Sequence, residues 1–290
     1  AARITSFVSW STQGNAHHFD EILFSVKPHA GQQQAATWIR NDLNHHEHER
    51  NSQRLQDRYS IRCAPHVIGC LMDALPWLRS LIENELNSAN DNPIVDPVGG
   101  YVLHGGHFYG GHIAMAMDTM KTAVANLSDL VDRQMALLMD PKFNHGLPAN
   151  LSADTSNQKP INHGFKAVQI AISAWTAEAL KQTMPASVFS RSTECHNQDK
   201  VSMGTIAARD CIRVLELTEQ ACAASLLACA QAAYIATEQQ GMALAEKKPA
   251  MYEMYQDILS FFDPVIADRP LESILRETVG YIREQRWELY

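Results

Sequence analysis

The stretch VSMGTIAARDCIRVLELTEQACAASLLACAQAAYIATEQ, Val201 to Gln239, decides the fold of this 290-residue chain. Apolar residues recur along it at helical spacing: Ile206, Val214, Leu217, Cys222, Leu226 and Ile235. Its second half is rich in alanine, which lets neighbouring helices approach closely on every side. At ~1.5 Å per residue, a helix of this length spans on the order of 55 Å. That is too long for an ordinary globule of this size, and it favours a bundle that helices from other subunits extend.

The same helical period recurs elsewhere in the chain. Residues 65–87 and 111–139 repeat apolar side chains every three or four positions, and Pro76 should kink the first of these helices. Residues 164–184 predict another helix, and 31–43 a shorter one, with loops rich in Asn, Gly, Pro, Ser and His between them. We therefore predict an all-α fold, an elongated bundle of long helices. Residues 1–240 form its central helical-bundle region, and residues 241–290 form short C-terminal helices.

Composition excludes several classes of function. The chain has 24 Lys+Arg against 32 Asp+Glu, a formal net charge of −8, which disfavours binding to nucleic acid or to an anionic membrane surface. The longest nearly apolar stretch, Ala221–Ala230, is about half of the ~20 residues that a membrane span needs. The six cysteines form no CxxC pair, a pattern typical of reduced, buried thiols. We expect a cytoplasmic protein with no nucleic-acid and no membrane partner.

Two polar clusters flank the helix predicted over residues 65–87. Gln56, Tyr59 and Arg62 lie at i, i+3 and i+6, so in a helix they would share a rough face. An amide, a phenol and a guanidinium could bind a carboxylate and handle a proton. By spacing alone, a solvated helix start explains them better. Likewise, Asn92 lies in Asn87–Pro93, where a helix stop with Asx turns is the simpler interpretation.

The segment His104–His112 combines glycines with three histidines. The glycines are followed by no Lys-Ser/Thr and preceded by no strand, so neither a Walker nor a Rossmann phosphate loop fits. No HExxH and no carboxylate at ligand spacing accompany the histidines, so we predict no metal site. The glycines are better explained as places where the backbone approaches a ligand closely. A second histidine run, at 45–48, predicts a solvent-exposed turn.

A fourth cluster, Ser192–Asp199, directly precedes the longest helix and contains Glu194 and Gln198. Such a polar group before a buried helix is unusual for a purely structural loop, although Thr193 or Asp199 could simply cap the helix. A catalytic Cys195–His196 pair is disfavoured, because neighbours in sequence do not present their side chains to each other.

Taken together and in this order, these segments resemble the aromatic amino-acid ammonia-lyase and aminomutase family, which includes histidine, phenylalanine and tyrosine ammonia-lyases. The resemblance covers most of the chain up to about residue 240. The matching segments are KPHAGQ (27–32), QDRYSIRCAPHVIG (56–69), NSANDNPIVD (87–96), GGHFYGGHIAMAMD (105–118), GLPANLS (146–152), PASVFS (185–190) and HNQDKVSMGTIAAR (196–209).

The resemblance implies an all-α homotetramer with shared active sites, which eliminates ammonia from an aromatic amino acid to give an arylacrylate. It also implies an electrophilic prosthetic group, methylidene-imidazolone (MIO), which forms from an Ala-Ser-Gly tripeptide. No Ala-Ser-Gly occurs in these 290 residues. We therefore expect the chain to be the C-terminal portion of a family member about twice its size, or a cleavage product, and to be inactive in isolation.

The resemblance assigns three residues to substrate binding. Arg62 matches the arginine that pairs with the substrate carboxylate, a role that suits a bidentate guanidinium. Asn92 matches an asparagine of the carboxylate region. Phe108 matches the phenylalanine beside MIO. His107 departs from the family, which commonly has asparagine at that position.

Four further residues match catalytic positions of the family. Tyr59 matches the tyrosine beside the electrophile and the substrate amine, and Gln56 matches a glutamine in the surrounding hydrogen-bond network. Glu194 stands where phenylalanine enzymes have a glutamate near the amine. Gln198 matches a position that is glutamine in phenylalanine and tyrosine enzymes but glutamate in histidine enzymes. Because an imidazole is better served by a carboxylate partner, Gln198 favours phenylalanine or tyrosine over histidine as the substrate.

Two alternatives stay open from the sequence. The chain could belong to an MIO-dependent aminomutase, which returns ammonia to the β carbon, since the motifs do not separate the two activities. It could also be a catalytically inert helical scaffold for assembly, against which the combination of Gln56, Tyr59 and Arg62 argues.

Overall fold

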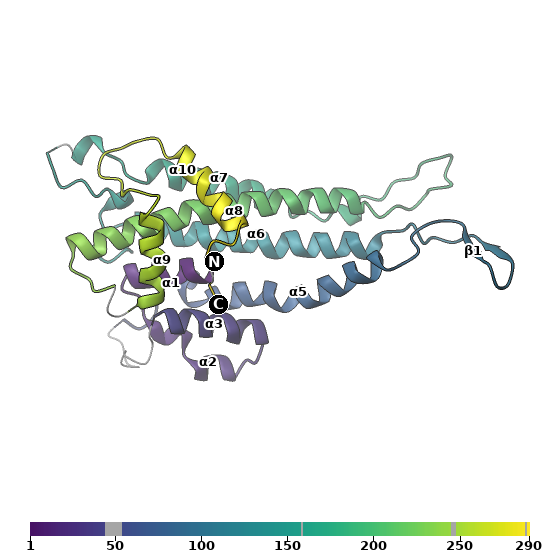
Figure 1. Cartoon of the computed structure of the whole chain (residues 1–290), viewed down its shortest axis with the longest axis horizontal. Coiled ribbons are helices and arrows are strands. Elements are labelled where there is room, and N and C mark those ends of the chain that lie inside the picture. Colours follow the sequence, from purple (N-terminus) through teal and green to yellow (C-terminus); the bar gives the residue numbers. More distant parts are fainter. Residues whose placement is uncertain (44–53, 158, 245–247, 288) are drawn as a thin grey trace.

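The structure is a computed structural model that describes residues 1–43, 54–157, 159–244, 248–287 and 289–290; the histidine run at 45–48 lies outside them. Over these ranges the chain is an elongated all-α bundle, as predicted (Figure 1). The helices are α1 (Ala2–Ser11), α2 (Glu21–Ser25), α3 (Ala30–Asp42), α4 (Tyr59–Arg62), α5 (Ala64–Leu86), α6 (Gly111–Met139), α7 (Lys166–Lys181), α8 (Gly204–Tyr234), α9 (Pro249–Leu259) and α10 (Glu272–Arg283). Shorter turns are η1 (Ala16–Phe19), η3 (Ala149–Leu151), η4 (Lys159–Ile161), η5 (Ala186–Val188) and the π-helical η6 (Ile235–Gln239). An antiparallel hairpin pairs β1 (Ile94–Asp96) with β2 (Tyr101–Leu103).

The long helices predicted from the sequence are confirmed, with differences at their ends. α6 has the predicted bounds. α5 continues through Pro76, and Figure 1 shows that this helix is bent along its length. α7 is shorter than the predicted 164–184. α8 begins at Gly204, so the prediction of helix from residue 201 was wrong. Met203 has a left-handed backbone, with φ of 60°, which cannot continue a right-handed helix.

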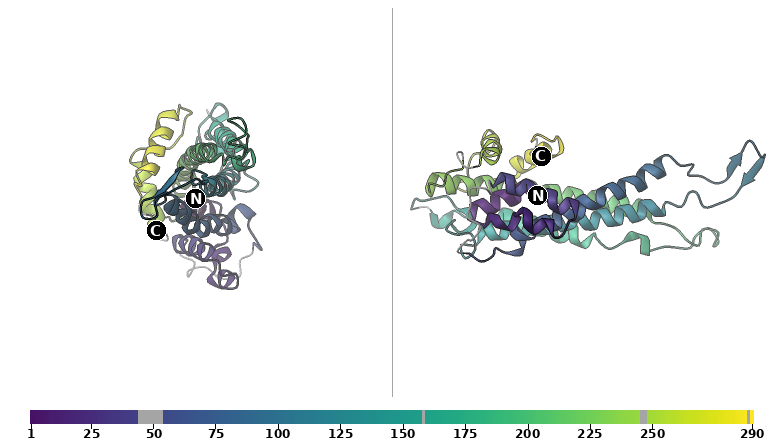
Figure 2. Two further views of the ribbon diagram at one scale, coloured as in Figure 1. Left: turned by 90° about the vertical axis from the view of Figure 1, so that its right-hand side faces the viewer. Right: turned by 90° about the horizontal axis from the view of Figure 1, so that it is seen from below.

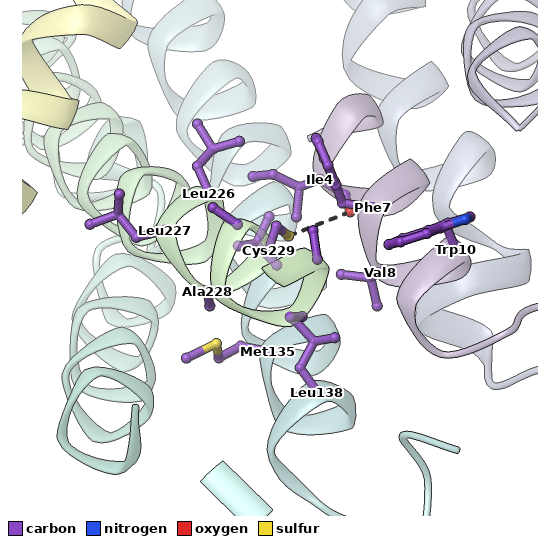
Figure 3. Close-up of a cluster of buried hydrophobic side chains, with 14 of the residues drawn as sticks. Ile4, Phe7, Val8, Trp10, Met135, Leu138, Leu226, Leu227, Ala228 and Cys229 are labelled. Carbon is purple, nitrogen blue, oxygen red and sulfur yellow. Dashed lines mark hydrogen bonds between the residues drawn. The ribbon is translucent and has the colours of Figure 1, made fainter. Parts of the chain in front are cut away.

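α8 forms the centre of the core because small side chains let other helices approach it. Every residue from Ala223 to Ala233 is buried. This confirms the prediction that the alanine-rich half of the helix is covered by neighbours on every side. α6 packs along α8, and α1 and α7 also lie against it. Figure 3 shows the α1 side chains beside those of α8 and α6. The residues labelled there are Ile4, Phe7, Val8 and Trp10 of α1, Met135 and Leu138 of α6, and Leu226, Leu227, Ala228 and Cys229 of α8.

The apolar length of this helix exceeds the stretch Ala221–Ala230 considered above. By length and composition alone, Gly204–Gln239 could cross a membrane, with a mean hydropathy of 1.2 over its most apolar window. However, 78% of that window is buried inside the bundle, as expected for the core helix of a packed domain.

The first helix and Tyr290 meet around a buried ion pair. The Arg3 Nε lies 2.9 Å from the Asp42 Oδ2, and these side chains are 7% and 4% exposed. The Tyr290 hydroxyl donates to the same carboxylate at 2.7 Å, and its ring stacks on Trp38 with centroids 4.5 Å apart. Residues after 240 thus share one core with α1 and α3, while the boundary at residue 240 stays a prediction.

A second link joins α9 to the segment that follows α10. Arg286 donates to both carboxylate oxygens of Asp257 at 2.8 Å, and the Trp287 Nε1 donates to Asp257 at 2.7 Å. The Arg286 guanidinium lowers the pKa of the Asp257 carboxyl. The C-terminal helices are therefore fastened to each other as well as to the bundle.

α3 and α5 cross where two glycines meet. A Cβ at Gly69 would lie 2.5 Å from the Gln32 backbone nitrogen, and one at Gly31 would lie 2.6 Å from the Gly69 carbonyl oxygen. Glycine is needed at both positions because the obstacle is backbone, which cannot rotate away.

All six cysteines are free thiols. Cys211 and Cys229 are buried in α8, as predicted, but the prediction of buried thiols was wrong for Cys70 and Cys195, which are exposed. Cys70 lies on α5 away from the packed core, and Cys195 lies at the tip of a projecting loop.

The end of the bundle that carries the β-hairpin leaves many large apolar side chains in solvent. The second half of α5 and the first halves of α6 and α8 meet there, and the hairpin extends beyond them (Figures 1 and 2). We call these side chains the distal face; its members are Leu75, Trp77, Leu86, Met115, Ile206, Ile212 and Leu215, each at least 41% exposed.

Candidate functional site

A hollow of about 730 Å³ lies where α4 meets the C-terminal end of α6, and we call it the arginine hollow. Arg54, Arg58 and Arg62 recur at every fourth residue along it, and Lys142 adds another cation. Among its described lining residues, Asp57 alone is acidic. This surplus of positive charge suits a carboxylate ligand. The full lining is Thr12, Arg54, Gln56, Asp57, Arg58, Tyr59, Ile61, Arg62, Leu137, Lys142, Phe143 and His145.

The Arg62 side chain is held in place by its own neighbourhood. Its Nε donates to the Asp57 carbonyl oxygen at 3.0 Å, and its Cζ lies 4.5 Å from the centroid of the Tyr59 ring. Within the described part of the chain, no hydrogen bond engages its two terminal nitrogens. The planar end of the guanidinium is therefore oriented and available for a bidentate bond to a carboxylate.

Asp57 fixes the carbonyl group on which Arg62 rests. Its carboxylate is buried, accepts from the Asn15 backbone nitrogen at 2.6 Å and forms an ion pair with Arg54. Its backbone nitrogen donates to the His18 Nε2 at 2.9 Å. Burial lowers the pKa of the His18 imidazole, so the ring stays neutral and can accept this bond. The turn before α4 is thus built around Asp57.

The three residues predicted as one cluster all line this hollow, but not as a helical face. α4 begins at Tyr59, so Gln56 lies before the helix, and the predicted helical face was wrong for Gln56. Both Gln56 and Tyr59 are exposed, Tyr59 by 71%. Sequence reasoning missed Arg54, Arg58 and Lys142, although the every-fourth spacing of the arginines was a usable signal.

A second hollow, of about 550 Å³, lies at the other end of the bundle, and we call it the loop hollow. Phe108 and Gln198 both line it, together with the N-terminal turns of α6 and α8. Phe108 is 59% exposed. The structure thus brings these two predicted residues together in an open, mixed polar and apolar setting. The full lining is Phe108, Tyr109, Gly110, Ile113, Asn197, Gln198, Lys200, Val201, Ser202, Met203, Gly204, Thr205 and Ile206.

Glu194 and Asn92 lie near this end but line neither hollow. Glu194 is at the tip of a loop closed by the pairing of Thr193 with Gln198, where it accepts from the Asn197 side-chain amide at 3.0 Å. The Asn92 side chain accepts from the Gly105 backbone nitrogen at 2.8 Å and so joins the two sides of the hairpin arm. Both side chains are exposed.

The two hollows lie far apart in one chain. Leu137 lines the arginine hollow and Ile113 lines the loop hollow, and both belong to α6. At ~1.5 Å per helical residue, their positions are about 36 Å apart along the helix axis. A single chain therefore divides the predicted site residues into two groups instead of one site.

The described residues contain no group of three His, Cys, Asp or Glu side chains placed to hold a metal ion. His104, His107 and His112 line neither the arginine hollow nor the loop hollow.

Both the sequence and the all-α fold of this chain have counterparts among known proteins. The sequence pattern of the family described as aromatic amino acid lyase matches residues 1–258. The chain belongs to the aromatic amino acid lyase family.

Its relatives within that family carry several activities. The tyrosine ammonia-lyase of Cereibacter sphaeroides is 34% identical, and the alignment covers 98% of this chain and 56% of that protein. The histidine ammonia-lyase of Natranaerobius thermophilus is 32% identical over 94% of this chain and 55% of that protein. The chain thus spans about half the length of the curated relatives it matches.

Solved structures agree with the family assignment. The histidine ammonia-lyase from Trypanosoma cruzi superposes with a TM-score of 0.87 at 28% identity, over 99% of this chain and 53% of that one. The Pantoea agglomerans phenylalanine aminomutase superposes with a TM-score of 0.85 at 27% identity, over 97% of this chain and 57% of that one.

Proposed function

We propose that this chain is part of an aromatic amino-acid ammonia-lyase and supplies the clamp for the substrate carboxylate. The orientation of Arg62 carries the proposal. Its Nε is anchored on the Asp57 carbonyl oxygen and its plane rests on Tyr59, so its outer edge can form two parallel hydrogen bonds to a carboxylate. Arg54, Arg58 and Lys142 add attraction for the anion.

The other residues of the arginine hollow suit the handling of the amine and of a proton. The Tyr59 phenol can accept or donate a proton, and the Gln56 amide can donate to and accept from the groups around it. Both side chains are exposed at the mouth of the hollow, where a bound substrate would meet them. We assign Tyr59, Gln56, Glu194 and Gln198 to the catalytic network, and Arg62, Asn92 and Phe108 to substrate binding.

The MIO group would have to come from another polypeptide segment, since residues 1–290 contain no Ala-Ser-Gly. The residues that would lie beside it fit a group brought to them from outside, because Tyr59 and Phe108 are 71% and 59% exposed. When bound, MIO supplies an electrophile that turns the substrate amine into a better leaving group. This chain's own part is to bind the carboxylate, hold the amine and limit access of water.

We further propose that the complete site forms between copies of the chain, within a homotetramer. Two observations support this. The two groups of site residues are about 36 Å apart in one chain, too far to contact one small substrate. The distal face beside the loop hollow leaves large apolar side chains exposed, as expected of a surface that another subunit covers.

The free thiols also support a reducing, cytoplasmic location.

Gln198 supports phenylalanine or tyrosine over histidine as the substrate. Its amide lines the loop hollow, where a carboxylate would better serve an imidazole ring. A Gln198→Glu variant of the active enzyme is expected to gain activity on histidine relative to phenylalanine and tyrosine. An unchanged ratio would contradict the preference.

An aminomutase is the second candidate, favoured by the close structural match to the Pantoea agglomerans phenylalanine aminomutase. Chromatography of the products separates the two, because a β-amino acid identifies the mutase and an arylacrylate the lyase.

The test of the proposal has two stages. Purified residues 1–290 alone should release no ammonia from phenylalanine, tyrosine or histidine; release with nothing added would overturn the dependence on a separate MIO segment. The chain is then co-expressed with a polypeptide that carries the family's Ala-Ser-Gly, such as the N-terminal part of a relative, and activity is expected.

In this active material, Arg62→Lys is expected to lower kcat/KM roughly 10- to 100-fold, from the loss of a charged bidentate bond worth ~1.5–3 kcal/mol. The matched control is Arg133→Lys, on the surface of α6 with a side chain 64% exposed, which should leave kcat/KM unchanged. Equal activity in the two variants would instead indicate that this chain serves only as a helical scaffold for assembly.

A further inference from the structure

Lys121 is a fully buried charge in the middle of α6, with 0% of its side chain exposed. Its Nζ lies 3.0 Å from the Asp118 Oδ1 and 3.2 Å from the Asp210 Oδ2, and it donates to the Met184 carbonyl oxygen at 2.8 Å. These partners belong to α6, to α8 and to the end of the segment that follows α7. One ammonium group thus joins three separate parts of the chain.

The carboxylate of Asp118 extends this link. Its two oxygens accept from the backbone nitrogens of Ala186 and Ser187, at 3.0 and 3.1 Å, and so cap the short helix η5. Although burial acts to raise it, the pKa of the Asp118 carboxyl is lowered by these backbone bonds and by Lys121. The charged form is therefore the one that the structure holds.

These contacts fall at the two ends of one excursion of the chain, residues 185–203. The upstream end is held at Met184, Ala186 and Ser187, and the downstream end is held through Asp210 in the second turn of α8. Within the excursion the hydrogen bonds of the backbone run mainly between its own residues, such as those from the Val201 nitrogen to the Ser190 Oγ and from the Thr193 nitrogen to the Gln198 carbonyl oxygen. The position of residues 185–203 therefore depends on the contacts that hold their two ends.

We propose that Lys121, with Asp118 and Asp210, is a positioning group that fixes the base of residues 185–203 and thereby sets Gln198 against Phe108 in the loop hollow. A charge buried this completely is retained at a high desolvation cost, which an apolar side chain would avoid. Its three partners converge from different elements, so it defines a geometry that packing alone would leave open. The role assigned to Gln198 rests on the proposed function, whereas the role of Lys121 in holding residues 185–203 does not depend on it.

Amide hydrogen exchange in the full chain tests the fixing directly. Lys121→Met, which keeps the length of the side chain, is expected to speed exchange in residues 185–203 about tenfold, with less than twofold change in α1 and α3. The matched control, Arg133→Met, removes an exposed cation from the same helix and should change neither region. Exchange in 185–203 that matches the control, or that rises equally throughout the chain, would overturn the proposal.

Two milder variants keep the test decisive if Lys121→Met does not fold. Asp118→Asn should speed exchange mainly at residues 185–190, and Asp210→Asn, whose side chain is 27% exposed, mainly in the first turn of α8. If both variants speed exchange at the same residues, or if neither variant changes exchange, the two ends are not anchored separately.

In the reconstituted enzyme, Lys121→Met is expected to lower kcat/KM about tenfold, and Lys121→Arg, which can reach the same oxygens, to restore part of it. If wild-type material shows no activity while the exchange pattern holds, the proposed function fails and the positioning role of Lys121 stands.

Discussion

The network between Arg3 and Asp42 offers the sharpest test of how this fold is held together. The Asp42 carboxylate forms an ion pair with Arg3 and accepts hydrogen bonds from the Tyr290 hydroxyl and from the Ser6 hydroxyl, both at 2.7 Å. Asp42→Asn keeps the shape and one acceptor oxygen but leaves the Arg3 guanidinium buried without a counter-charge. Breaking one partner of a buried pair costs about 3–5 kcal/mol. Because Arg3 keeps its bond to the Ala250 carbonyl oxygen at 2.8 Å, we expect the lower end, about 3 kcal/mol.

Urea unfolding followed by circular dichroism measures this loss. With a slope of ~3 kcal/mol/M, the midpoint should fall by about 1 M. The double variant Arg3→Met/Asp42→Asn removes the stranded charge, so it should be more stable than the sum of the single changes predicts, by about 2 kcal/mol. The control is Glu272→Gln in an exposed ion pair with Arg276, whose removal should change the free energy by less than ~0.5 kcal/mol. Strictly additive effects, or a loss at Asp42 no larger than the control, would refute the reasoning.

Three further predictions concern stability and thiol reactivity. The Arg286 guanidinium lowers the pKa of the Asp257 carboxyl, so the ion pair stabilises the fold fully above about pH 4, and this stabilisation is lost as the pH falls through the folded-state pKa. In urea melts, Asp257→Asn should therefore cost about 0.5 kcal/mol near pH 7, and the cost should shrink as the pH is lowered through that pKa. Gly69→Ala should destabilise by about 2 kcal/mol or more, whereas Gly280→Ala, in a helix with open space around it, should stabilise by about 0.5 kcal/mol in the same assay. A thiol reagent should label Cys70 and Cys195 rapidly in the folded chain and the buried thiols of α8 only on unfolding, and mass spectrometry of the peptides would show any exception.

The long helices could be predicted because their cause is local. Apolar residues recur with a helical period over 111–139, and the second half of 201–239 is rich in alanine. Both patterns favour an α-helix, and both helices form nearly as expected. The missed start of α8 depends on the left-handed Met203, a backbone choice set by the loop before it. The π-helical turn at Ile235–Gln239 likewise depends on tertiary contacts that no period reveals.

The candidate site was predictable in its residue types but not in its arrangement. Gln56, Tyr59 and Arg62 share a hollow, and Phe108 and Gln198 share another. The separation of the two hollows follows from the path of the chain, because α5 crosses the bundle between the first cluster and Phe108. Which residues a partner subunit would bring to each hollow is a property of the assembly, and a single sequence holds no local signal for it.

The contact between Arg3 and Tyr290 joins residues 287 positions apart. During synthesis, the ten wholly buried residues of α1 leave the ribosome long before the segment that seals them, by roughly 15–60 s at ~5–20 residues per second. Over that interval α1, with its buried Phe7 and Trp10, lacks part of the surface that covers it in the folded chain. The packing of α1 is therefore completed only by segments that lie far downstream of it in the sequence.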